Sequence, residues 1–155
     1  MKFTEFLSLE SIFVDIEADS KKNVFKILGN LFAKKNASLA STIINRLNER
    51  ERLGSTSVGN GVAIPHVKIR GLTKICGFFS SLERPIDFEA ADKQPVDLIF
   101  TLLAPENNKG TEHLKALAMV SRVFNDKNIR AKLRSSENTD SLFAILTINE
   151  DSKAA

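Results

Sequence analysis

The amino-acid sequence predicts an α/β fold in which strands and helices form a layered sandwich. Two segments with a helical apolar face precede a strand-rich middle, and further helices close the chain. Residues 96–104 form a near-continuous apolar run, which is typical of a strand covered on both faces. The chain has 155 residues and no internal repeat or long linker. We therefore expect a single domain over residues 1–155.

Two helices are predicted in the first third of the chain. Apolar side chains recur at helical spacing in residues 20–35, and Asp19 or Ser20 can act as the N-cap. The second helix should begin at Ser38 and end near Arg52, with Gly54 just past its C-terminus. The inward positions are Val24, Leu28, Leu31 and Phe32 in the first helix and Leu39, Ile43, Ile44 and Leu47 in the second.

Residues 53–67 differ in composition, because they contain glycines and a proline but no charged side chain. Short strands are predicted at residues 56–58 and 62–64, and longer strands at residues 74–82 and 96–104. Thr111 can cap a helix that runs to about Asn125. Two shorter helices are predicted near residues 129–134 and 139–146.

Composition and charge restrict the class of protein. The net charge is only +3, from 22 basic and 19 acidic residues, and Trp and Tyr are absent. Because nucleic-acid binding favours a basic patch with aromatic residues, we expect no nucleic-acid partner. The longest strongly apolar run, residues 98–104, is far shorter than the roughly 20 residues of a membrane span. Glu5 and Glu10 interrupt the apolar residues at the N-terminus, so no signal peptide is visible and we expect a cytoplasmic protein.

Several common catalytic and binding motifs are absent from the sequence. Gly59-Asn60-Gly61 lacks the third glycine of a dinucleotide-binding loop and the Lys-Ser/Thr ending of a P-loop, and no G-x-S-x-G motif occurs. The single cysteine, Cys76, lies in an apolar run and is interpreted as a small buried hydrophobic residue. With two scattered histidines it makes a poor zinc site, so we expect no metal and no cofactor. We interpret four acids as solvated loop residues: Asp87, Glu89, Asp92 and Asp97.

The two histidines, His66 and His113, are the candidate reactive groups. His66 follows a short apolar strand and Pro65, so backbone geometry fixes its position on a loop at the strand end. His113 falls in the first turn of the predicted helix that Thr111 precedes. The positive end of a helix dipole favours a neutral imidazole and attracts anions such as a phosphoryl group. The alternative for each histidine is a structural or merely solvent-exposed side chain.

A long motif precedes the first histidine: Arg50-Glu51-Arg52-Leu53-Gly54-Ser55-Thr56-Ser57-Val58-Gly59-Asn60-Gly61-Val62-Ala63-Ile64-Pro65-His66. It resembles the active-site signature of the IIA domains of the fructose–mannitol class, from the phosphoenolpyruvate-dependent phosphotransferase system of bacteria. Residues 85–88, 94–100 and 113–120 are also similar to that family, and the resemblance extends over about residues 6–146. Within the family, the sequence looks most like the stand-alone nitrogen-related IIA proteins.

The resemblance implies a mixed β-sheet flanked by α-helices and a role for three residues. His66 matches the phosphorylated histidine, His113 the second active-site histidine, and Arg50 the arginine that stabilises charge or orders the loop. The implied donor is an HPr-like phosphocarrier protein, the nitrogen-related carrier NPr. Regulated target proteins are the implied recipients of the signal, and the scheme needs no metal.

One position departs from the family pattern. Val67 stands where the family usually has a small residue, often glycine, directly after the histidine. It could narrow the approach of the carrier, so we expect Val67→Gly to preserve or raise the transfer rate. Apolar side chains around His66, namely Val62, Ile64, Val67 and Phe79, could give the carrier a docking patch or face the core, and we expect a mixture of the two.

Two other functions remain open at this point. A sugar-specific IIA component would pass its phosphate to a IIB domain for sugar uptake. A regulator from another class would bind its targets through the same fold without phosphorylation of His66.

Overall fold

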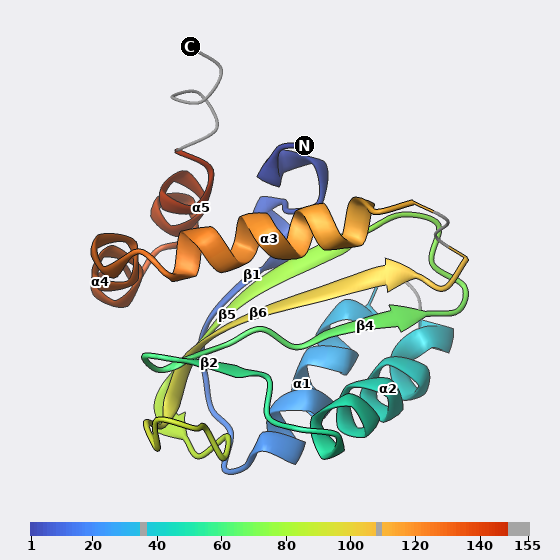
Figure 1. Cartoon of the computed structure of the whole chain (residues 1–155), viewed down its shortest axis with the longest axis horizontal. Coiled ribbons are helices and arrows are strands. Elements are labelled where there is room, and N and C mark those ends of the chain that lie inside the picture. The colour runs from blue at the N-terminus through green and yellow to red at the C-terminus, as the bar shows by residue number, and fades with distance from the viewer. Residues whose placement is uncertain (35–36, 108–109, 149–155) are drawn as a thin grey trace.

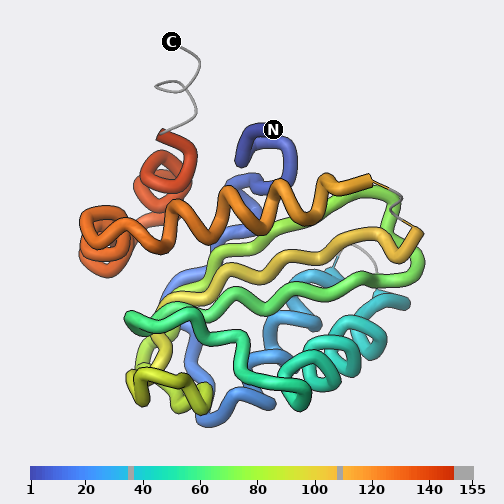
Figure 2. The backbone as a smooth tube through the Cα atoms, in the orientation of Figure 1, coloured from blue at the N-terminus to red at the C-terminus, as the bar shows by residue number. Residues whose placement is uncertain are grey.

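The computed structural model describes residues 1–34, 37–107 and 110–148 and consists of a β-sheet between two layers of helices (Figure 1; Figure 2). One face is covered by α1 (Lys21–Phe32) and α2 (Ala40–Arg52). The other face carries α3 (Glu112–Phe124), α4 (Lys127–Ser135) and α5 (Thr139–Thr147). Three 3-10 turns complete the helical elements of the described residues: η1 (Phe3–Glu5), η2 (Leu9–Ser11) and η3 (Ala37–Leu39).

The sheet has six strands: β1 (Ile12–Ile16), β2 (Ser57–Gly59), β3 (Val62–Ala63), β4 (His66–Ile69), β5 (Cys76–Ile86) and β6 (Val96–Pro105). Their order is β1-β5-β6-β3-β2, and β4 also pairs with β6. The β5–β6 and β2–β3 pairs are antiparallel, whereas β1–β5, β3–β6 and β4–β6 are parallel. The expected α/β sandwich with a mixed sheet is therefore confirmed.

Strands β3 and β4 behave as one strand with a short break. Val62 pairs with Leu98 and His66 pairs with Leu102, so both strands follow β6 in the same register. The break falls at Ile64 and Pro65. Proline has no N–H to donate, but the Pro65 carbonyl still accepts from the Leu102 N–H at 2.9 Å. The Ile64 N–H instead donates to the carbonyl of Thr56 at 3.0 Å.

This break corrects the expected position of His66. The sequence suggested a loop after a strand end, but His66 is the first residue of β4 and is half-buried. The proline marks an interruption rather than an end, because β6 continues to pair on both sides of it. The candidate nucleophile is consequently fixed by a strand ladder.

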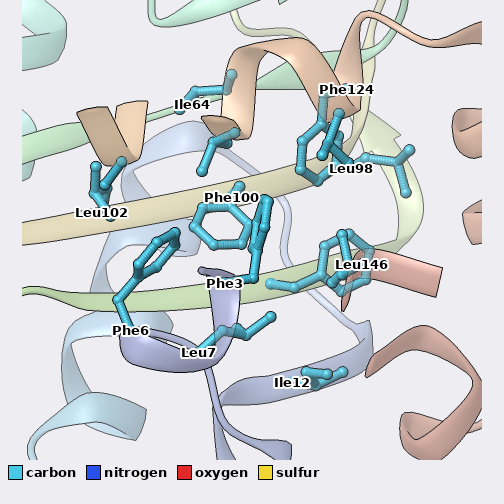
Figure 3. Close-up of a cluster of buried hydrophobic side chains, with 14 of the residues drawn as sticks. Phe3, Phe6, Leu7, Ile12, Ile64, Leu98, Phe100, Leu102, Phe124 and Leu146 are labelled. Atoms are coloured by element: carbon cyan, nitrogen blue, oxygen red, sulfur yellow. The ribbon is translucent and has the colours of Figure 1, made fainter. Parts of the chain in front are cut away.

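The long strand β6 is buried on both faces, as its apolar composition predicted. Leu98, Phe100 and Leu102 belong to the cluster under α3, α4 and α5, whereas Ile99 and Leu103 pack under α1 and α2. Figure 3 shows the first cluster, where the N-terminal segment also contributes. The Phe3 ring meets Phe100 edge-on, with the ring centroids 6.0 Å apart.

Most helix predictions are confirmed, with small shifts at the ends. The Ser20 side chain caps α1 by accepting from the Asn23 N–H at 3.0 Å. The helix ends at Phe32, three residues before the predicted end at Lys35, which itself lies outside the described residues. Helix α2 starts at Ala40 rather than Ser38, because residues 37–39 form the 3-10 turn η3. Cys76 is half-buried at the start of β5, not fully buried as predicted.

Candidate active site

A pocket of about 620 Å³ contains all three residues that the sequence singled out, Arg50, His66 and His113. Its walls come from the C-terminal end of α2, from β4 and β6, and from the first turns of α3. Arg50 and His113 lie in two different helices and are distant from His66 in the sequence, so it is the fold that brings the three residues together. Both histidines are half-buried, which leaves them accessible to a reactant in the pocket.

The ring of His66 is held in one orientation by its own strand. Side chains alternate along β4, so Val67 and Ile69 are buried under α1 and α2 while His66 is turned to the opposite face. Nδ1 of His66 lies 2.8 Å from the carbonyl oxygen of Ile64. A carbonyl can only accept a hydrogen bond, so Nδ1 carries the proton and Nε2 keeps its lone pair. This is the nucleophilic form of the neutral ring.

His113 lies in the first turn of α3, as predicted. The Thr111 side chain, however, makes no capping hydrogen bond. Nδ1 of His113 is buried and has no hydrogen-bond partner within the described part of the chain. A buried N–H without an acceptor is costly, so the tautomer with its proton on Nε2 is favoured. Such a ring can donate one hydrogen bond from Nε2.

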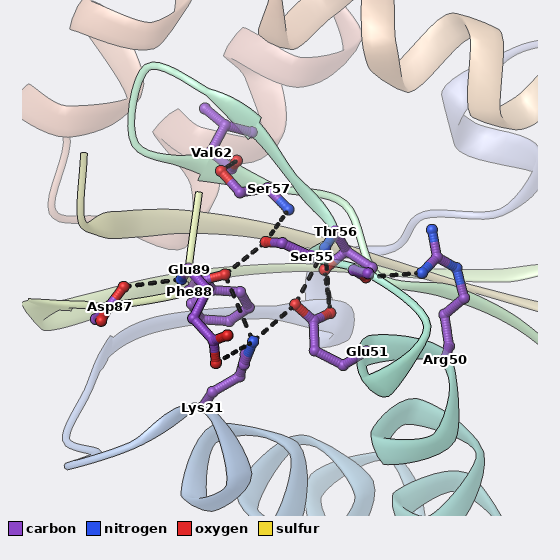
Figure 4. Close-up of polar contacts among 11 residues, drawn as sticks. Lys21, Arg50, Glu51, Ser55, Thr56, Ser57, Val62, Asp87, Phe88 and Glu89 are labelled. Carbon is purple, nitrogen blue, oxygen red and sulfur yellow. Dashed lines mark hydrogen bonds and ion pairs between the residues drawn. The ribbon is translucent and has the colours of Figure 1, made fainter. Parts of the chain in front are cut away.

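Arg50 is half-buried in the last turn of α2 and orders the turn that follows. Its Nη1 group donates to the carbonyl oxygen of Gly54 at 2.9 Å (Figure 4). A guanidinium has five N–H donors in a rigid fork, and one carbonyl uses only a small part of that capacity. Arg50 can therefore order the turn and contact an anion in the pocket at the same time.

The pocket has an excess of positive charge. Arg46, Arg52 and Lys68 line it in addition to Arg50, and Glu49 is the acid among the lining residues. Glu49 is paired with Arg46 at 2.8 Å. Arg46 also donates from Nε to the carbonyl oxygen of Lys68 at 3.3 Å, which ties α2 to β4. The remaining cations create a positive potential that favours an anionic group.

The prediction that these apolar residues form a docking patch around His66 is wrong. Val62 and Phe79 are 0% exposed, Ile64 is 2% exposed, and all three pack in the core. All three belong to the cluster under α3, α4 and α5, on one face of the sheet. The exposed apolar side chains that line the pocket are instead Leu53 and Leu114, at 87% and 55%.

Val67 also has a different role from the one expected. It contributes to the pocket wall, but its side chain is only 8% exposed and belongs to the cluster under α1 and α2. Its branched side chain therefore fills the core beside β4 and does not stand above the His66 ring. The expectation about the transfer rate of Val67→Gly remains a prediction, and a stability cost must be added to it.

Sequence reasoning missed one functional candidate, Glu51. Its carboxylate is buried and accepts from the Thr56 N–H at 3.1 Å and from the Thr56 hydroxyl at 2.6 Å (Figure 4). Lys21 pairs with it at 3.1 Å. In the sequence it stands between two arginines at a helix end, and an acid in such a setting is usually exposed to solvent. The only signal was its place inside the motif that precedes His66.

Three members of the predicted acidic cluster, Asp87, Glu89 and Asp92, are exposed, as expected, and one of these, Glu89, also pairs with Lys21 at 3.5 Å. Backbone N–H groups of Asn60 and Gln94 donate to the Asp92 carboxylate and hold its pKa below the ordinary value of 3.8. Asp97 departs from the prediction, because it forms an ion pair with Arg134 at 2.9 Å and is only half-exposed.

Within residues 1–34, 37–107 and 110–148, no group of three or more His, Cys, Asp or Glu side chains is placed to bind a metal ion. The helices of the same ranges are too short or too polar to span a bilayer.

Comparison with known proteins now identifies the family. The family model described as the phosphoenolpyruvate-dependent sugar phosphotransferase system, EIIA 2, matches residues 5–148. The chain belongs to this family. IIA proteins of the system receive phosphate from phosphocarrier proteins, so the chain is a phosphoryl-transfer component.

Relatives of this IIA protein include both regulatory and sugar-specific proteins. It is 43% identical over 148 residues to the nitrogen regulatory protein of Bradyrhizobium diazoefficiens, covering 96% of each chain. The crystal structure of the nitrogen regulatory protein IIA-Ntr from Neisseria meningitidis has a TM-score of 0.86 and 40% identity, covering 92% of this chain and 97% of that chain. The fructose-specific EIIABC component of Bacillus subtilis is 32% identical over 151 residues, which are 94% of this chain and 23% of that protein.

Proposed function

We propose that this IIA protein accepts a phosphoryl group on Nε2 of His66 from an HPr-like phosphocarrier protein. Its phosphorylation state then regulates target proteins in the nitrogen-related branch of the system. The observation that carries the proposal is the 2.8 Å contact between Nδ1 of His66 and the Ile64 carbonyl. It leaves Nε2 unprotonated without the help of a general base.

The transfer forms one bond and breaks one bond. The lone pair of His66 Nε2 attacks the phosphorus of the carrier's phosphohistidine. The P–N bond to the carrier ring breaks, and its electron pair returns to that ring. If the carrier ring is protonated on its other nitrogen, it leaves neutral, while His66 keeps its own proton on Nδ1. No proton therefore has to move during transfer.

The pocket supplies charge stabilisation for this step. Phosphoryl transfer requires little covalent chemistry from the protein, so positioning and electrostatics dominate catalysis. Arg50 would pair with equatorial oxygens, and His113 would donate from Nε2 to one of them. The start of α3 adds the positive end of its helix dipole.

The carrier would dock around the mouth of the pocket. Leu53 and Leu114 are the exposed apolar side chains of the pocket lining; Leu53 directly follows α2, and Leu114 lies in α3. Apolar contact between the two proteins would be flanked by Arg52 and Lys68. A carrier that must leave after each transfer is expected to use an interface of modest area.

The nitrogen-related branch is supported by the names and identities of the relatives. The nitrogen regulatory protein of Bradyrhizobium diazoefficiens is 43% identical to this chain, whereas the fructose-specific relative is 32% identical. A sugar-specific role is therefore less well supported, and the nitrogen-related carrier NPr is the expected donor.

Phosphoryl labelling tests the proposal. The protein is incubated with phosphoenolpyruvate, the first enzyme of the system and either NPr or a sugar-branch HPr. We expect one acid-labile phosphate per chain, faster labelling with NPr, and no label on His66→Ala. A label that persists in His66→Ala contradicts the assignment of the acceptor. An unlabelled wild-type protein would indicate a phosphorylation-independent regulator instead.

A further inference from the structure

A chain of hydrogen bonds behind the pocket leads from the buried carboxylate of Glu51 to the ring of His66. The carboxylate accepts from the N–H and the hydroxyl of Thr56, at 3.1 and 2.6 Å. The carbonyl of Thr56 accepts from the Ile64 N–H at 3.0 Å. The carbonyl of Ile64 in turn accepts from Nδ1 of His66 at 2.8 Å. Only two residues, Thr56 and Ile64, separate the carboxylate from the reactive ring.

Glu51 is well fixed at the start of this chain. Its side chain is only 5% exposed, and the Lys21 side chain, whose ammonium pairs with it at 3.1 Å, is 19% exposed. The same ammonium lies 5.6 Å from the centroid of the Phe88 ring. Burying a carboxylate is costly unless hydrogen bonds and a counter-ion satisfy it, and here Thr56 and Lys21 supply both.

The segment between α2 and β3 is held from a second side as well. The Ser55 hydroxyl donates to the carbonyl of Phe88 and accepts from the Ser57 N–H at 3.1 Å (Figure 4). Thr56 is thus held on one side by the contact of its neighbour Ser55 with Phe88, and on the other by its own hydrogen bonds to the charged Glu51. The N–H of Gly54 also donates to the backbone carbonyl of Glu51 at 3.2 Å. The carbonyl of the same Gly54 accepts the hydrogen bond from Arg50.

We infer that Glu51 is a positioning residue for phosphoryl transfer, which rests on the proposed role of His66 as the acceptor. Glu51 fixes Thr56, Thr56 fixes Ile64, and the Ile64 carbonyl selects the tautomer of His66 in which Nε2 is nucleophilic. Glu51 touches neither the carrier nor the phosphoryl group. Its effect is therefore expected on the chemical step and not on carrier binding.

The size of the effect follows from what the Ile64 carbonyl does. Without a fixed acceptor, the proton of a neutral imidazole distributes between Nδ1 and Nε2, and rings protonated on Nε2 cannot attack. Misorientation of the remaining rings adds a loss, because catalysis depends on near-attack geometry. We expect about a tenfold slower transfer in Glu51→Gln.

The experiment compares Glu51→Gln with Thr56→Val and with a control, Asp97→Asn. Asp97→Asn also removes a partly buried, ion-paired carboxylate, but Asp97 pairs with Arg134 and takes no part in the chain to His66. Transfer is measured as a function of carrier concentration. Nitrogen NMR of the unphosphorylated proteins reports which ring nitrogen of His66 is protonated, and thermal unfolding reports stability.

The expected result separates positioning from general destabilisation. Glu51→Gln lowers the rate at saturating carrier about tenfold, leaves the half-saturating carrier concentration within about twofold, and gives a mixed tautomer at His66. Thr56→Val loses one of the two hydrogen bonds that Thr56 donates to Glu51, and it shows the same changes to a smaller degree, about threefold. If Glu51→Gln does not fold, Thr56→Val carries the test. Asp97→Asn loses stability but keeps the wild-type tautomer and rate.

Two outcomes overturn the inference. Glu51→Gln and Thr56→Val could retain the wild-type tautomer and rate, or Asp97→Asn could slow transfer as much as they do. Failure of the proposed function looks different, because wild-type protein would then take up no phosphate on His66 while the tautomer measurement stays informative.

Discussion

Replacing Val67 by glycine should destabilise the fold much more than the same replacement at the next residue, Lys68. The Val67 side chain is 8% exposed and packs under α1 and α2, whereas Lys68 is exposed on the same strand. Loss of a buried valine side chain costs about 1.5–3 kcal/mol. Glycine inside a strand costs roughly 0.5–1 kcal/mol more. Val67→Gly should therefore lose about 2–4 kcal/mol, and Lys68→Gly only the roughly 0.5–1 kcal/mol of the backbone.

Thermal unfolding measures this difference. For a chain of this size, 1 kcal/mol corresponds to roughly 2–4 °C in Tm. We expect Val67→Gly to unfold about 4–16 °C below the wild-type protein, and Lys68→Gly about 1–4 °C below it. Equal losses in the two variants would refute the packing role of Val67. If labelling of folded Val67→Gly is as fast as wild type or faster, the family's small residue at this position is compatible with transfer.

Three further predictions concern the site and its supports. His113→Ala should slow labelling of His66 about 10–100-fold without changing the final amount of phosphate, because one donor to the phosphoryl oxygens is lost; an unchanged initial rate would make His113 a structural residue. Leu53→Asp should raise the half-saturating concentration of carrier about tenfold without altering the maximal rate, as titration of the carrier in the labelling assay would show, and an unchanged value would exclude docking at Leu53. Asp92 has a lowered pKa, so it stabilises the fold above its unfolded pKa of 3.8 and loses this contribution as the pH falls through the lower folded value. Urea unfolding at neutral pH should therefore give a lower free energy of unfolding for Asp92→Asn than for the wild-type protein, and this difference should shrink at about pH 3. A difference that stays constant with pH would contradict the stabilising role of the ionised Asp92.

Local sequence patterns predicted most of the helices and the two long strands. Ser20 is a side-chain cap followed by helical apolar spacing, and both signals depend only on nearby residues. β6 was identifiable because a strand buried on both faces has few polar positions. Strand β1 was missed, since its five residues include Asp15 and its pairing with β5 is a long-range contact.

The sequence named the residues of the candidate site but could not predict their geometry. The resemblance supplied Arg50, His66 and His113, and the structure adds that one pocket contains them all. The position of His66 inside a strand could not be foreseen, because Pro65 is also a normal strand terminator. Glu51 was overlooked for a physical reason of the same kind. Whether an acid is buried depends on partners such as Lys21 and Thr56, which only the fold brings to it.

The most direct test of the account is the position of the phosphate on the His66 ring. Phosphorus and nitrogen NMR of the phosphorylated protein distinguish the two ring nitrogens. Because Nδ1 donates to the Ile64 carbonyl at 2.8 Å, the account predicts a single phosphohistidine linked through Nε2. A phosphoryl group on Nδ1 of His66, or on a residue other than His66, would contradict it.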